Sequence, residues 1–142
     1  MPRAIVQLPD TFVYSTEIPV RITDINYGGH LGNDALLSLI QEARVRFLKK
    51  YGFSEKDVGG CGIIMVDAVI IYKSQAFYGD VLKIEITADD FGKIACDLIY
   101  RITQANNGKE IARAKTRIAF YDYQQNKTVP IPEVFVKIFQ SN

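Results

Sequence analysis

Residues 21–52, RITDINYGGHLGNDALLSLIQEARVRFLKKYG, decide the fold that we expect for this chain. Three glycines and two asparagines within residues 24–33 indicate a loop. After the loop, apolar residues recur at helical spacing, namely Leu36, Ile40, Ala43 and Phe47. We expect Asn33 or Asp34 to cap the start of this helix and Gly52 to end it.

Strand patterns lie on both sides of this helix. Residues 12–22 are rich in β-branched and aromatic types and predict a first strand, in which Pro19 indicates an edge position or a bulge. Residues 62–73 form an apolar run that is typical of a central strand. Alternating patterns then predict strands over residues 81–87, 94–103 and 109–123. The order predicts an α+β fold, an antiparallel sheet wrapped on one long helix.

Length and charge exclude several classes of protein. A chain of 142 residues is expected to form a single domain, residues 1–142, and its net charge of +1 argues against a dedicated nucleic-acid binder. No apolar run is long enough for a membrane span, and no signal core begins the chain, so we expect a cytoplasmic protein. Cys61 and Cys96, with one histidine, are too few for a typical zinc site, so no metal is expected.

The loop before the helix holds the densest group of polar side chains in the chain: Asp24, Asn26, His30, Asn33 and Asp34. A glycine-rich loop that leads into a helix leaves backbone N–H groups free, and these favour an oxyanion or a carbonyl oxygen that gains negative charge. The alternative is purely structural, with glycines making a tight turn and the polar side chains satisfying the loop.

Residues 21–52 resemble the hotdog-fold thioesterases of the 4-hydroxybenzoyl-CoA thioesterase type. Those proteins carry D-x-D-x-x-G-H-V-N-N or a close variant, followed by a helix with Glu, Ala and Arg and a terminal glycine. The matching positions here are Asp24, His30, Asn33, Glu42, Ala43, Arg44 and Gly52. Residues 72–82 resemble the family's second strand, its G-D turn and the next strand, so the resemblance extends from about residue 15 to 132. It implies a hotdog fold, one long helix wrapped by a five- to six-stranded antiparallel sheet.

One position departs from the family pattern. Where the resemblance implies a catalytic Asp, this chain has Asn26, which cannot ionise and can only hold a water or donate to a carbonyl. Asp34 is the nearest replacement base, unless it serves as the helix cap, and Glu42 is the next, unless it pairs with Arg46. His30 can accept a proton or donate to a carbonyl, or it can anchor the loop by a hydrogen bond. Asp24 is expected to bond loop N–H groups or to touch substrate.

A basic stripe on the last long strand provides candidate phosphate ligands. Arg113, Lys115 and Arg117 alternate on one strand face, and Lys73 is a similar case. Given the resemblance, we expect these cations to contact the phosphates of coenzyme A. The alternative is a solvated outer face of the sheet.

The resemblance implies an acyl-CoA or acyl-ACP thioesterase that uses water, with no cofactor beyond the coenzyme A of its substrate. The expected mechanism has an amide N–H near Asn33 polarising the carbonyl, Asn26 and His30 positioning substrate or water, and Asp34 or Glu42 as base. The resemblance also implies a homodimer or homotetramer with sites across the subunit interface. A hotdog enoyl-CoA hydratase or dehydratase, or a non-catalytic binder of acyl-CoA or acyl carrier protein, remains an alternative.

Overall fold

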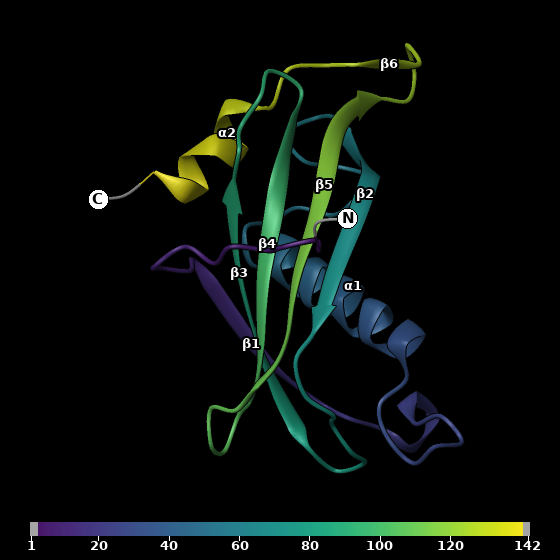
Figure 1. The fold of residues 1–142 in the computed structure, drawn as a ribbon. Coiled ribbons are helices and arrows are strands. Elements are labelled where there is room, and N and C mark those ends of the chain that lie inside the picture. Colours follow the sequence, from purple (N-terminus) through teal and green to yellow (C-terminus); the bar gives the residue numbers. More distant parts are fainter. Residues whose placement is uncertain (1–2, 141–142) are drawn as a thin grey trace.

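A six-stranded antiparallel sheet lies against one long helix in the computed structural model, which describes residues 3–140 (Figure 1). The strands are β1 (Tyr14–Pro19), β2 (Gly62–Tyr72), β3 (Val81–Asp89), β4 (Ala95–Gln104), β5 (Glu110–Asp122) and β6 (Lys127–Thr128). The spatial order is β1-β3-β4-β5-β2, and β6 pairs with β5. The helical elements are η1 (Ile22–Asp24), α1 (Asn33–Lys50), α2 (Glu133–Val136) and η2 (Lys137–Phe139). The predicted α+β fold is confirmed.

Helix α1 has 18 residues and supplies much of the core. Its buried apolar side chains are Leu36, Leu39, Ile40, Ala43, Phe47 and Leu48. Gly52 ends the helix as predicted: it has φ +79°, its N–H bonds the Lys49 carbonyl, and the Phe53 N–H bonds the Leu48 carbonyl. The predicted cap at Asn33 or Asp34 is wrong, because the helix already includes both residues and Gly32 is its N-cap.

The sheet has an inner face toward α1 and an outer face. On β5 the residues Ala112, Ala114, Thr116, Ile118 and Phe120 are buried against the core. The intervening Arg113, Lys115 and Arg117 lie on the outer face, as the alternation predicted. The N-terminal segment, residues 3–13, passes over this outer face on its way to β1 (Figure 1).

Strand β2 is an edge strand, so its prediction as a central strand is wrong. It pairs with β5 on one side only. Its side chains Ile64, Met65 and Val66 are exposed by 36%, 45% and 57%. An apolar run indicates that a strand avoids water, but it does not reveal which neighbour covers the strand.

A buried arginine ties α1 to the sheet. Arg44 is 3% exposed, and its Nε donates to Glu55 at 2.9 Å while its Nη1 donates to the Tyr100 hydroxyl at 3.3 Å. That hydroxyl also shares a 2.8 Å hydrogen bond with Thr116. Burial alone would lower the pKa of Arg44, but Tyr100 and Glu55 outweigh burial and raise it, so the guanidinium keeps its charge.

The two cysteines lie apart from the loop before α1. Cys96 is fully buried, and burial raises the pKa of its thiol to about 12. Burial, helped by Asp122 and Asp57, also raises the pKa of Cys61. Both thiols are therefore protonated at neutral pH and are not activated nucleophiles. Within residues 3–140, no helix combines the length and the apolar character that crossing a membrane requires.

Candidate active site

Asp24 organises the start of the loop before α1. Its carboxylate is 5% exposed and accepts hydrogen bonds from the Arg21 backbone N–H at 2.8 Å and from the Arg21 guanidinium at 3.1 and 3.2 Å. Burial alone would raise the pKa of this carboxyl, but the bonds and charge of Arg21 outweigh burial and lower it. Its backbone carbonyl accepts from the Gly32 N–H at 3.0 Å. The Asp24 side chain therefore bonds one loop N–H group, that of Arg21, and contact with substrate stays a prediction.

The lowered pKa of Asp24 predicts an acid-sensitive loop. A carboxyl whose folded pKa lies below its unfolded value, near 3.9, stabilises the fold above that value, and this contribution is lost as the pH falls through the folded pKa. We expect Asp24→Asn to lower the free energy of unfolding by about 1–3 kcal/mol at pH 7. Urea denaturation at pH 7 and below pH 4 measures the difference. A difference that does not shrink in acid would contradict the assigned role.

Asn26 shapes the turn that follows. Its Oδ1 accepts from the Gly28 N–H at 2.9 Å, and its N–H donates to the His30 carbonyl at 3.0 Å. Gly29 adopts φ +87°, which favours glycine, and its N–H bonds the Asn26 carbonyl. Asn26 thus holds the loop that carries His30.

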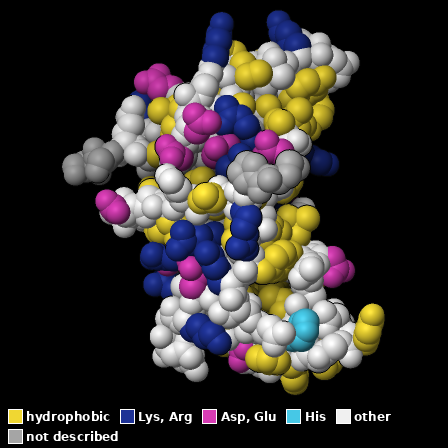
Figure 2. Space-filling model, in the orientation of Figure 1, with side chains coloured by type: hydrophobic (Ala, Val, Ile, Leu, Met, Phe, Trp, Pro, Cys, Tyr) yellow, Lys and Arg dark blue, Asp and Glu magenta, His cyan; other side chains and the backbone are white. Residues whose placement is uncertain are grey.

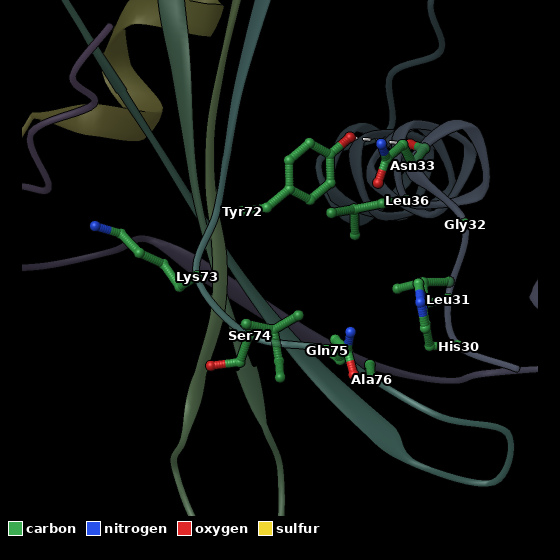
Figure 3. Close-up of a pocket in the computed structure, with 11 residues that line it drawn as sticks. His30, Leu31, Gly32, Asn33, Leu36, Tyr72, Lys73, Ser74, Gln75 and Ala76 are labelled. Carbon is green, nitrogen blue, oxygen red and sulfur yellow. Dashed lines mark hydrogen bonds between the residues drawn. The ribbon is translucent and has the colours of Figure 1, made fainter. Parts of the chain in front are cut away.

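A cavity of about 310 Å³ opens between this loop, the start of α1 and the end of β2 (Figure 3). Its polar lining includes His30, Asn33, Tyr72, Ser74 and Gln75, and its apolar lining includes Leu31, Leu36, Ala76 and Ile111. A hydrogen bond of 2.8 Å from the Leu31 N–H to the Ala76 carbonyl joins the loop to the segment after β2. The cavity therefore combines an apolar wall with convergent polar groups, as small-molecule sites do.

The start of α1 supplies backbone donors to this cavity. Gly32 and Asn33 line it, and among the described residues no side chain caps the helix end. The first N–H groups of a helix have no partner within the helix and carry its positive dipole end. A Cβ at Gly32 would lie 2.9 Å from the Asp34 Oδ1, so a larger residue there would displace the Asp34 side chain. The arrangement suits a carbonyl oxygen that acquires negative charge.

Tyr72 is a cavity residue that the site prediction missed. Its ring stands across the cavity from the loop, and its hydroxyl donates to the Asn33 carbonyl at 3.2 Å (Figure 3). Burial and then the charge of Asp34 raise the pKa of Tyr72, so the hydroxyl stays protonated. The sequence held a signal, since Tyr72 ends the apolar run of β2, but only the fold shows that this end meets α1.

Glu42 lies outside the cavity. Its carboxylate accepts from the Arg46 Nε at 2.8 Å, which is the i,i+4 pair named as the alternative to catalysis. Together with Arg21 and Ser38 it lines a separate hollow between α1 and the end of β1. The structure therefore does not bring Glu42 together with His30 and Asn33.

The predicted basic residues are divided between two environments. Lys73 lines the cavity next to Tyr72. Lys115 lies 3.7 Å from Asp67 and 4.0 Å from Asp97, and Arg117 lies 3.0 Å from Asp97. Arg113 pairs with Glu110 at 2.8 Å. The stripe therefore lies on the outer face, away from His30, and its cations are held by carboxylates.

An antiparallel sheet against one long helix, with a polar cavity at the helix start, defines a hotdog-fold protein. The family model for the thioesterase-like superfamily matches residues 20–139. The chain belongs to the thioesterase-like superfamily.

Solved structures share this fold at low sequence identity. Slr0204, a 1,4-dihydroxy-2-naphthoyl-CoA thioesterase from Synechocystis, is 23% identical, with 89% of this chain and 94% of that chain covered at a TM-score of 0.80. The DHNA-CoA thioesterase from Staphylococcus aureus is 20% identical, with coverages of 87% and 89% and a TM-score of 0.76. The gentisyl-coenzyme A thioesterase BH1999 is 18% identical, with coverages of 89% and 100% and a TM-score of 0.78.

Proposed function

We propose that this protein hydrolyses the thioester of an acyl-CoA or acyl-ACP, with water as co-substrate and no cofactor. The observation that carries the proposal is the position of the chain's single histidine. His30 lines a cavity that is also lined by Gly32 and Asn33 at the start of α1. Membership of the thioesterase-like superfamily and the names of the three similar enzymes support the same reaction class. We retain the cytoplasmic location as part of this proposal.

In the proposed mechanism the thioester carbonyl oxygen lies at the N–H groups of the first turn of α1, beside Asn33. His30 accepts a proton from water as the water oxygen attacks the carbonyl carbon. The tetrahedral intermediate collapses, the carbon–sulfur bond breaks, and His30 returns the proton to the leaving thiolate. The products are the free acid and the thiol. The Tyr72 hydroxyl and the Asn33 side chain help to orient the acyl group.

The carboxylates then have supporting roles. The Asp24 carboxylate, like the Asn26 side-chain amide, accepts a hydrogen bond from a backbone N–H of the loop, and Glu42 is paired with Arg46. Within residues 3–140, Asp34 is not among the residues that line the cavity, although after burial its charge raises the pKa of Tyr72. We therefore assign the base to His30, in place of the carboxylate base expected from the sequence.

We propose in addition that a second copy of the chain covers the free edge of β2. An exposed apolar edge strand of 11 residues is a template for pairing with another strand. In an antiparallel pair of β2 strands, the start of one strand lies next to the end of the other, where Tyr72 borders the cavity. Each cavity would then be completed by the partner copy.

This pairing predicts a dimer in solution, or a tetramer built from two such dimers. Val66→Lys places a charge in the proposed interface and is expected to yield monomers and to reduce activity. The matched control is Val134→Lys on α2, where the side chain is exposed by 50%. Sedimentation velocity measures the mass of both variants. A monomeric unmodified protein, or a Val66→Lys protein with unchanged mass, would contradict the pairing.

Hydrolysis itself is tested by thiol release from a panel of acyl-CoA and acyl-ACP substrates, from aromatic to long-chain acyl groups. We expect release above the uncatalysed rate for at least one substrate. Loss of enoyl absorbance without thiol release would indicate a hydratase instead. Binding of acyl-CoA without turnover would indicate a non-catalytic binder.

A further inference from the structure

The segment that follows β2 is held both to the sheet and to the loop before α1. The Lys73 N–H bonds the Ile111 carbonyl of β5 at 2.8 Å. Three residues further on, the Ala76 carbonyl accepts a hydrogen bond of 2.8 Å from the Leu31 N–H. Gln75 lies between these two anchors, so its backbone has a fixed position opposite the loop that carries the histidine.

His30 lies between its own turn and the cavity. A Cβ at Gly28 would lie 3.4 Å from the His30 Nε2, so the ring is close to this turn on one side. Within residues 3–140, the lining of the cavity includes His30 but not Gly28. The ring is half-buried, and it is visible at the surface in Figure 2, where it is the cyan side chain. Solvent water therefore reaches the ring.

Gln75 brings a side-chain amide to the wall of the cavity that faces this turn. In Figure 3 the Gln75 amide lies on the His30 side, whereas the Lys73 side chain and the Ser74 hydroxyl extend away from it. A glutamine amide offers one oxygen acceptor and two N–H donors. Of the three consecutive residues, Gln75 is therefore the one whose polar group is directed toward the proposed base.

The Gln75 amide and the His30 ring are both free to bind water. The side-chain hydrogen bond between lining residues in the described part of the chain is the one from Tyr72 to Asn33 (Figure 3). In that part of the chain, neither the Gln75 amide nor the His30 ring makes a hydrogen bond. A water that bridges two polar groups is nearly as favourable as a direct hydrogen bond. An acceptor and a base that line one cavity can therefore hold a water between them.

We propose that Gln75 positions the attacking water for His30, an inference that rests on the proposed thioesterase function. One hydrogen of the water is directed to the His30 ring and the other to the Gln75 Oε1. When the water oxygen bonds the carbonyl carbon, His30 takes the first proton. The second hydrogen stays on the new hydroxyl of the tetrahedral intermediate, still bonded to Gln75. Gln75 exchanges no proton, so it is a positioning residue whose effect falls on kcat.

The kinetic test replaces the amide by an apolar side chain of similar length. Gln75→Met should lower kcat about 10- to 100-fold and leave the KM for acyl-CoA within about twofold, because only the orientation of the water is lost. Gln75→Glu keeps an acceptor oxygen and should retain kcat within about threefold at pH 8. The matched control is Gln124→Met in the turn after β5, which should change neither constant. That turn lies beside the start of β2, at the opposite end of the strand from Gln75 (Figure 1).

A second readout does not depend on turnover. His30 is the chain's only histidine, so its ring signals in carbon–proton NMR spectra of the untagged protein are unambiguous. Gln75→Glu places a carboxylate at the proposed water, and a nearby anion favours the protonated ring. We expect the midpoint of the His30 titration, and the acid limb of kcat against pH, to rise by about half a unit to one pH unit. Gln124→Glu adds the same charge at the far end and should move neither. The other ionisable groups that line the cavity within residues 3–140, Tyr72 and Lys73, are the same in all variants.

The outcomes separate this inference from the proposed function. If the unmodified protein hydrolyses acyl-CoA and Gln75→Met keeps its kcat, the positioning role is overturned and the thioesterase stands. If no thioester is hydrolysed, the function fails and the positioning role fails with it. A His30 midpoint that Gln75→Glu moves no more than Gln124→Glu does would show that the two side chains do not share a water, and it would overturn the inference whatever the kinetics.

Discussion

His30→Gln is expected to lower the kcat of thioester hydrolysis by about 10²- to 10⁴-fold, the usual contribution of a general base. Glutamine keeps a polar side chain in the cavity but cannot accept the proton of the attacking water. Because His30 acts on the transition state in this account, KM should change little. Steady-state kinetics with the best acyl-CoA of the panel measures both constants.

Two observations indicate that this substitution should remove the proton acceptor without changing the shape of the loop. Among the described residues the His30 side chain makes no hydrogen bond, and the turn is held by backbone bonds and by Asn26, so the loop should keep its shape. Glu42→Gln is the matched control, since Glu42 is paired with Arg46 outside the cavity, and its kcat should stay within about threefold of the unmodified protein. A His30→Gln enzyme with nearly full kcat would refute the assignment of the base.

Glu55→Ala is expected to cost about 3 kcal/mol of the free energy of unfolding, the lower end of the range for breaking a buried ion pair, because Glu55 itself is 32% exposed. The reason is the position of Arg44, which is 3% exposed and loses its only carboxylate partner among the described residues. For a chain of this size the loss corresponds to a fall in Tm of roughly 10 °C. Thermal and urea denaturation followed by circular dichroism measure it.

The control for this change is an ion pair nearer the surface. Glu85 pairs with Arg101 at 2.8 Å, but Arg101 is 37% exposed and can be solvated when its partner is removed. Glu85→Ala should therefore cost less than about 1 kcal/mol. Equal losses for Glu55→Ala and Glu85→Ala would show that burial of Arg44 does not set the energy of its pair.

The elements themselves were predictable because their signals are local. The spacing from Leu36 to Phe47 defines α1, and Gly52 ends it where the left-handed conformation is needed. The alternation along β5 predicted that its basic residues lie on one face and its small apolar residues on the other. Each of these signals depends on neighbours within a few residues, and none requires knowledge of the tertiary arrangement.

The features that the sequence did not predict depend on contacts between residues that are far apart in the chain. The apolar run of β2 is the same whether another strand of the sheet or another molecule covers it, so its edge position was missed. Tyr72 became a site residue only because the end of β2 meets the start of α1. For Glu42, the pair with Arg46 was foreseen from the sequence, yet its separation from the cavity had to come from the structure.

The measurement that tests the central claim most directly is thiol release from the acyl-CoA panel by the unmodified protein and by His30→Gln, side by side. The account predicts turnover of at least one acyl-CoA by the unmodified protein and a fall of about 10² or more in His30→Gln. Turnover that survives the loss of His30, or no turnover of any thioester by the unmodified protein, would contradict it.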